Sequence, residues 1–85
     1  MNDIEYDIIN ELYFVTAFRD LAQKLDVADT ELSANLEGLI LKGYVKCFYP
    51  DPDNETEYKA EDFFDKCRSY YFLATKEGLL AHNSR

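Results

Sequence analysis

The sequence predicts a small α+β domain, in which three helices precede a two-stranded hairpin and a short C-terminal helix. The first observation is a helix-turn-helix pattern over residues 18–45, where two amphipathic stretches flank a short turn-forming segment. The second observation is a change of pattern after Gly43, because β-branched and aromatic side chains replace the helical period there. We expect one domain over residues 1–85.

The helix-turn-helix is predicted from the spacing of its apolar side chains. The first stripe recurs at the i, i+3, i+4, i+7 positions of one helix face and comprises Phe18, Leu21, Ala22 and Leu25. Residues 26–29 interrupt that period, and Asp29 is the expected cap of the next helix. Gly43 is expected to take the left-handed position after this helix. The second stripe, which should share one core with the first, comprises Leu32, Leu36, Leu39 and Ile40.

A further helix is predicted at each end of the chain. Asn2 followed by Glu5 is a capping-box pattern for the N-terminal helix. Its expected apolar stripe is Ile4, Ile8, Leu12 and Val15, although residues 13–16 could instead leave the helix and extend. Thr16 is the expected cap of the second helix, and Thr75 the expected cap of a last one. That last helix should return Leu79 and Leu80 to the core.

The hairpin is predicted to pair residues 44–49 with residues 68–75, which are rich in strand formers. Between them lies an acidic insert at about residues 50–67, and its first half is turn-rich. Residues 60–67 fit either a short helix, which we favour, or an extension of the second strand. The alternating acids from Asp51 to Asp62 resemble a calcium loop only faintly, because Thr56 replaces the required glycine. We interpret this segment as an acidic loop.

Composition narrows the classes of function. There are 17 acidic residues against 9 Lys and Arg, for a formal net charge of −8, which disfavours long-range attraction to nucleic acid. No apolar run approaches the roughly 20 residues that span a bilayer, and the acidic N-terminus does not resemble a targeting signal, so we expect a cytoplasmic protein without membrane contact. Cys47 and Cys67 lack zinc-site spacing and are interpreted as buried thiols, with their mutual distance left open.

Several motifs indicate a resemblance to a known superfamily. Leu21-Ala22 with Leu25, the later leucine stripe, and Gly43-Tyr44-Val45 resemble the winged helix-turn-helix pattern of bacterial transcription regulators. The segment TKEGLL at residues 75–80 is similar to the end of the second wing strand in MarR-like and PadR-like proteins. Ala74 and the insert depart from that pattern. The resemblance implies a small winged helix-turn-helix fold.

The same resemblance implies that the helix over residues 30–42 would lie in a DNA major groove. The residues that would then contact DNA are Ser33, Asn35, Lys42, Lys46, Lys66 and Arg68. However, residues 25–41 contain no Lys or Arg, and their acids would repel phosphate groups. DNA binding is therefore the alternative hypothesis.

The preferred hypothesis is a non-enzymatic module that binds a protein partner, for which a basic surface would be the natural complement. Nine of the thirteen aromatic residues lie between Tyr44 and Phe72, and exposed aromatic side chains often anchor protein interfaces. We expect Phe63, Phe64 and Phe72 to be buried. The expected contact residues are Glu31, Ser33, Glu37, Tyr49, Tyr70 and Tyr71. A homodimer through the first and last helices is a third hypothesis.

No catalytic, cofactor or metal site is predicted. His82 is the single histidine and lies in the terminal segment without a recognisable nucleophile. The two cysteines have no basic neighbour arranged to activate a thiolate, and the three glycines form no phosphate-binding loop.

Overall fold

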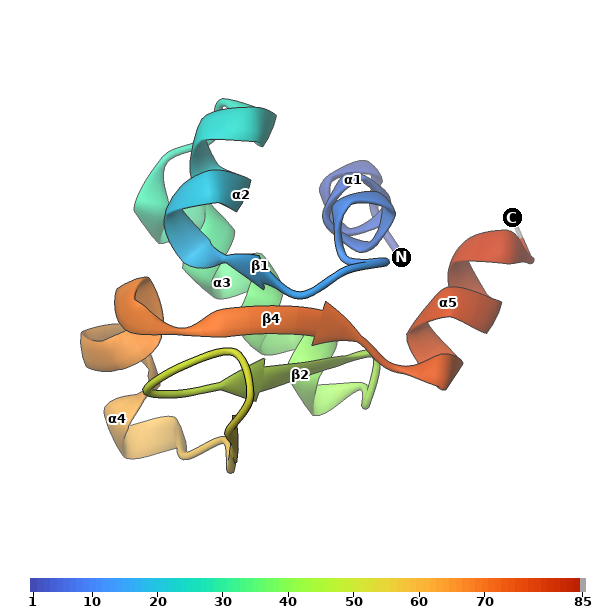
Figure 1. The fold of residues 1–85 in the computed structure, drawn as a ribbon. Helices are drawn as coiled ribbons and strands as arrows, with labels where there is room; N and C mark the ends of the chain where they lie inside the picture. The colour runs from blue at the N-terminus through green and yellow to red at the C-terminus, as the bar shows by residue number, and fades with distance from the viewer. Residues whose placement is uncertain (85) are drawn as a thin grey trace.

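The computed structural model describes residues 1–84 (Figure 1). In chain order the elements are α1 (Asp3–Glu11), β1 (Thr16–Ala17), α2 (Phe18–Leu25), α3 (Asp29–Leu41), β2 (Val45–Phe48), β3 (Glu55–Thr56), α4 (Ala60–Lys66), the 3-10 turn η1 (Cys67–Ser69), β4 (Tyr71–Ala74) and α5 (Lys76–Asn83). No helix within this range is long and apolar enough to cross a membrane.

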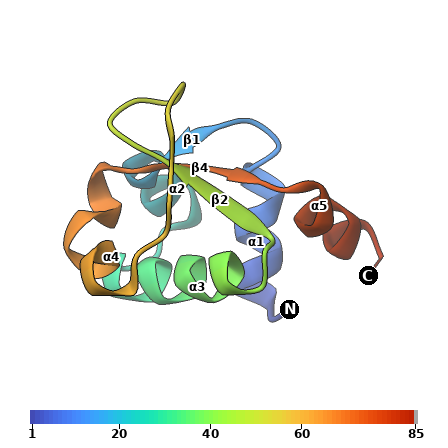
Figure 2. The same ribbon diagram turned by 90° about the horizontal axis from the view of Figure 1, so that it is seen from below.

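The strands form one antiparallel sheet in the order β1-β4-β2-β3. Helices α1, α3 and α4 lie on one side of this sheet, and no helix of residues 1–84 covers the other side (Figure 2). The register places Cys47 opposite Phe72, and both side chains are buried against the helices. The predicted hairpin is thus the centre of a four-stranded sheet, whose two outer strands are two residues long.

The predicted helix-turn-helix core is confirmed. Leu21, Leu32, Leu36 and Leu39 are fully buried in one cluster, and Leu25 and Ile40 pack against it while half-buried. The turn between α2 and α3 is closed by Asp26, which adopts a left-handed backbone conformation with φ of 53°. Gly43 takes the predicted left-handed position after α3, with φ of 78°.

Several predicted helix ends were confirmed and others were wrong. The Asn2–Glu5 capping box is present at α1, and the Thr75 hydroxyl accepts a hydrogen bond from the Gly78 N–H at α5. Helix α1 ends before Val15, which is exposed, because the chain leaves the helix to form β1. Thr16 lies in that strand, so Ala17 precedes α2, and Ala28 rather than Asp29 occupies the N-cap of α3.

The insert is folded against the rest of the chain. Residues 60–66 form a helix, as favoured, and Phe63 and Phe72 are buried as expected. Two expectations were wrong, because Phe64 on α4 and Leu80 on α5 are exposed. Both thiols are buried and neither forms a disulfide, which confirms their interpretation, and burial, assisted by Glu55, raises the pKa of Cys47 to about 11.

Candidate functional site

The outward side of α3 carries small and apolar side chains. Helical spacing places Thr30, Ala34, Gly38 and Leu41 along the side away from the core leucines, with Gly38 at the edge that faces Glu5 of α1. Thr30, Ala34 and Leu41 are exposed, and none of the four is charged. We call these four residues the outward stripe. Its flanks, rather than the stripe itself, carry the acidic groups of α3.

The insert and the turn η1 that follows it are held to one flank of α3 by two polar contacts. The Tyr58 hydroxyl donates a hydrogen bond of 2.6 Å to Oε2 of Glu37. This bond to a carboxylate favours the protonated phenol and raises the pKa of Tyr58 to about 12. At the start of the helix, Nε of Arg68 lies 3.0 Å from Oδ2 of Asp29. The position of α4 beside α3 is therefore fixed partly by acids of α3.

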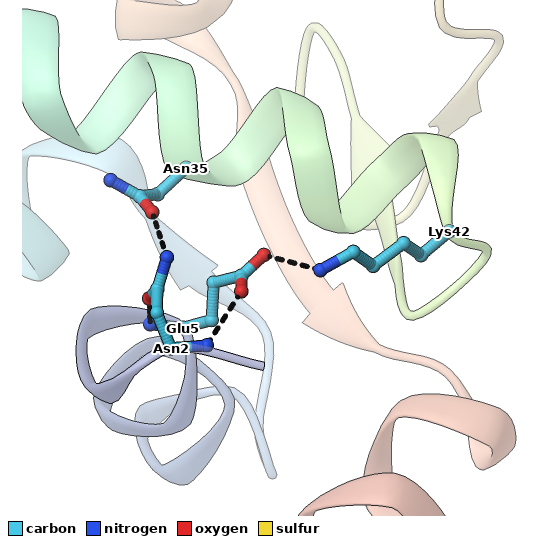
Figure 3. Close-up of polar contacts among 4 residues, drawn as sticks. All are labelled: Asn2, Glu5, Asn35 and Lys42. Carbon is cyan, nitrogen blue, oxygen red and sulfur yellow. Dashed lines mark hydrogen bonds and ion pairs between the residues drawn. The ribbon is translucent and has the colours of Figure 1, made fainter.

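The second flank of α3 faces α1 across a buried carboxylate, Glu5 (Figure 3). Glu5 Oε1 accepts a hydrogen bond of 2.9 Å from the Asn2 N–H, and Oε2 lies 3.0 Å from Lys42 Nζ. Burial alone would raise the pKa of Glu5, but the Asn2 hydrogen bond and the Lys42 ammonium outweigh it and lower the pKa. Glu5 is thus a buried anion that holds Lys42 against α1.

Asn35 lies on the same flank and is also engaged within the molecule. Its Nδ2 donates a hydrogen bond of 2.9 Å to the Glu31 carbonyl, and its Oδ1 accepts one of 3.4 Å from Asn2 Nδ2 (Figure 3). Both polar ends of this amide therefore have partners before any ligand binds.

All four cations predicted to contact DNA are in ion pairs. Besides Lys42 with Glu5 and Arg68 with Asp29, Lys46 pairs with Glu55 at 3.7 Å and Lys66 with Asp62 at 3.6 Å. Each pair has no net charge, which weakens its attraction for a phosphate group. The predicted cations exist on the surface, but their charge is largely compensated.

Two residues predicted to contact a partner are inaccessible. Ser33 is only 2% exposed, and its hydroxyl donates a hydrogen bond to the Asp29 carbonyl and lies beside Cys67 Sγ. Tyr70 is buried with its ring 5.5 Å from that of Tyr49. Glu31 and Tyr49 are exposed, whereas Glu37 and Tyr71 are half-buried. Ser33 and Tyr70 therefore act in packing, and the predicted contact surface is smaller than expected.

Glu5 and Tyr58 have roles in the structure that were not predicted from the sequence. Glu5 was interpreted only as a helix cap, although its second carboxylate oxygen has room for a cation. Tyr58 is the only aromatic residue in the acidic stretch before α4. A single aromatic side chain among acidic residues is the feature of the sequence that could have indicated a contact with the rest of the fold.

The order of the elements defines the class of fold. Helices α2 and α3 form a helix-turn-helix, and the antiparallel strands that follow form its wing, so this is a winged helix-turn-helix. A solved structure named "Multiple Antibiotic Resistance Repressor, MarR" has the same fold, with a TM-score of 0.74 and 16% sequence identity. The similarity covers 99% of this chain and 53% of that one, so the chain spans about half the length of the matched protein.

Two other comparisons found nothing similar. No protein-family model matches the chain. No curated protein sequence matches it. The winged-helix fold is therefore shown by the structure and by its similarity to the MarR structure.

Proposed function

We propose that this chain is the DNA-binding domain of a transcriptional regulator. The observation that carries the proposal is the similarity to the MarR repressor, which extends over 99% of the chain and so includes both the helix-turn-helix and the wing. This similarity favours DNA binding over the protein-partner hypothesis, which it does not support. In this class of fold the second helix of the motif enters the major groove.

The outward stripe limits the chemistry that α3 can use to recognise bases. The methyl groups of Thr30 and Ala34 suit contact with the methyl group of thymine. Glu31, at the edge of the stripe, can accept a hydrogen bond from the amino group of cytosine. These contacts distinguish bases but supply no attraction to the phosphate backbone.

Binding should consequently depend little on non-specific electrostatics. The predicted cations are paired, and the chain carries a net charge of −8. Counterion release normally provides most non-specific affinity for DNA. We expect binding to random duplex DNA at physiological salt to be weaker than about 100 μM, with a shallow dependence on salt.

The test is a selection of bound sequences from a random duplex library at low salt, followed by fluorescence anisotropy on the enriched sequence. Ala34→Glu places a negative charge on the outward stripe and should abolish binding. Leu80→Glu adds the same charge at an exposed apolar position of α5 and serves as the matched control. Failure to enrich any sequence, or equal loss of binding in both variants, would contradict the proposal.

The acidic surface of α3 favours a second candidate, a basic protein partner. Glu31 is exposed and has no ion-pair partner among the described residues, and Glu37 adds a second, half-buried acid to the same helix, whereas Asp29 is paired with Arg68. Under this hypothesis Glu31→Lys should weaken capture of a protein from lysate, as should Tyr49→Ala. The same Glu31→Lys change would strengthen salt-sensitive binding to duplex DNA if α3 faces the groove.

A further inference from the structure

Three Lys and Arg side chains have no ion pair in the part of the chain that the structure describes: Arg19, Lys59 and Lys76. Arg19 lies on α2 and Lys76 begins α5, whereas Lys59 lies in the insert directly before α4. Lys59 is exposed, and its neighbour Tyr58 bonds to Glu37 on α3. The position of this unpaired cation is thus tied to the helix that is proposed to bind DNA.

The path of the insert decides which part of it lies beside α3. The turn between β2 and β3 lies on the side of the sheet away from α3, whereas the segment before α4 runs from the sheet to the level of α3 (Figure 2). The turn also carries Asp51 and Asp53 without a Lys or Arg, so it would repel a phosphate group. Residues 57–60, and not the turn, are therefore the part of the insert that can meet DNA bound to α3.

A helix that enters the major groove brings its flanking elements to the phosphate backbone. An α-helix with its side chains is about 10–12 Å wide and the groove is about 12 Å wide, so α3 would fill the groove. Elements level with α3 on its flanks then lie over the phosphate walls. On one flank lies α1, where Lys42 is already paired with Glu5. On the other flank lie residues 57–60 and α4, so Lys59 lies where a phosphate group would pass.

We propose that Lys59 contacts a phosphate group of duplex DNA when α3 occupies the major groove, and that Tyr58 positions Lys59 through its bond to Glu37. This inference rests on the function proposed above and names a contact outside α3. Tyr58 is held by two contacts, because its hydroxyl donates to Glu37 at 2.6 Å and its ring centre lies 5.6 Å from that of Phe63. Phe63 is buried in the core, so the backbone next to Lys59 is fixed before DNA arrives.

The acids next to Lys59 set the size of the expected effect. Glu57 and Glu61 stand two positions to either side, so residues 57–61 contain one lysine against two glutamates. Such a segment attracts no phosphate group from a distance, and Lys59 acts only when DNA is close. One contact between a lysine and a phosphate changes the slope of log affinity against log salt concentration by about 0.9. A single contact of this kind agrees with the shallow salt dependence expected for the whole domain.

The first test is a salt series of fluorescence anisotropy measurements on the sequence enriched from the random library, with circular dichroism to verify folding. Lys59→Ala should weaken binding about 5- to 10-fold at about 0.1 M salt and make the slope shallower by about 0.9. Lys76→Ala removes the same charge from an exposed, unpaired position on α5 and should change neither quantity. Binding that Lys59→Ala leaves unchanged, or equal losses in both variants, would overturn this inference alone. Absence of wild-type binding would overturn the proposed function as well.

The second test asks whether Tyr58 acts through Lys59. Tyr58→Phe keeps the ring against Phe63 but cannot donate to Glu37, so it should give a smaller loss of affinity and of salt slope. The double variant Tyr58→Phe/Lys59→Ala should bind no more weakly than Lys59→Ala alone, because no cation is then left to position. Losses that add in the double variant would contradict the positioning role, since they would show that Tyr58 acts independently of Lys59.

The third test locates the phosphate group. Methylphosphonate groups, which carry no charge, are placed one at a time along both strands of the enriched duplex. At one position the neutral group should weaken binding of the wild type and leave binding of Lys59→Ala unchanged, because this variant already lacks the cation. A scan in which both proteins lose affinity at all the same positions and to the same extent would overturn the contact.

Discussion

The buried carboxylate of Glu5 allows a quantitative test of how α1 is held on α3. In Glu5→Gln the side chain keeps its shape and can still accept the hydrogen bond from Asn2, but it loses the charge that pairs with Lys42. The Glu5 side chain is 7% exposed and that of Lys42 is 46% exposed, so the pair is only partly screened by water. Hydrogen bonds to charged groups contribute about 1.5–3 kcal/mol, and the exposed lysine reduces this to about 1–2 kcal/mol.

Urea denaturation at neutral pH should show that the unfolding free energy of Glu5→Gln is lower than that of the wild type by this amount, and its melting temperature should be lower by about 5–12 °C. The matched control is Glu11→Gln, also on α1. Glu11 pairs with Lys24 at 3.3 Å, but the two side chains are 24% and 69% exposed. Removing this surface pair should cost less than about 0.5 kcal/mol. Equal losses in the two variants would refute the argument from burial.

The pH dependence gives an independent check with a definite sign. The pKa of Glu5 is lower in the folded state than its ordinary value of 4.5. The charge of Glu5 therefore stabilises the fold fully above about pH 4.5, and this contribution is lost as the pH falls through the folded-state pKa. The difference in unfolding free energy between wild type and Glu5→Gln should be constant from pH 6 to 8 and should shrink toward pH 3. A difference that persists unchanged at pH 3 would show that the charge is not its cause.

Three further predictions concern packing and the insert. Leu36→Ala, in the core, should lower the unfolding free energy by about 2–5 kcal/mol, whereas Leu41→Ala on the exposed side of α3 should change it by less than about 0.5 kcal/mol in the same urea assay. A Cβ at Gly78 would overlap the Tyr44 carbonyl oxygen, so Gly78→Ala should lower the unfolding free energy by about 1–3 kcal/mol. A Cβ at Gly38 would lie 3.7 Å from Glu5 Oε2, so Gly38→Ala should raise the unfolding free energy by up to about 1 kcal/mol. Thermal melts in which Gly38→Ala is the less stable of the two variants would contradict this packing. The difference in ultraviolet absorbance between wild type and Tyr58→Phe should titrate near pH 12 and move to lower pH in a Glu37→Gln background; titration near pH 10 in both backgrounds would contradict the bond to Glu37.

The helical part of the fold was predictable because its signals are local. The spacing of Leu32, Leu36 and Leu39 requires a common face whatever surrounds it, and Gly43 ends the helix by its own backbone preference. The strand at Thr16 was not predictable in the same way, because a two-residue strand exists only through its pairing with Phe72, far away in the sequence. The local pattern around Thr16 instead resembled a helix cap.

The candidate site was harder to predict than the fold for a related reason. Lys42, Lys46 and Arg68 are recognisable as cations in the sequence. Their ion-pair partners, however, are distant in the sequence or lie on a neighbouring strand, so local sequence patterns do not indicate the pairing. Ser33 was expected at the surface because serine is polar. It is buried instead, since its hydroxyl is satisfied by the Asp29 carbonyl within the same helix.

The junction between α3 and α5 has a mechanical consequence. The Thr75 hydroxyl donates a hydrogen bond of 2.6 Å to the Gly43 carbonyl while accepting one from Gly78, and the Thr75 N–H donates to the Tyr44 carbonyl at 2.9 Å. The turn that ends α3 and the turn that begins α5 are thus joined through one residue, with the Gly78 backbone packed directly on Tyr44. Because these contacts join the two turns directly, we expect a tilt of α5 to move the C-terminal end of α3 with it.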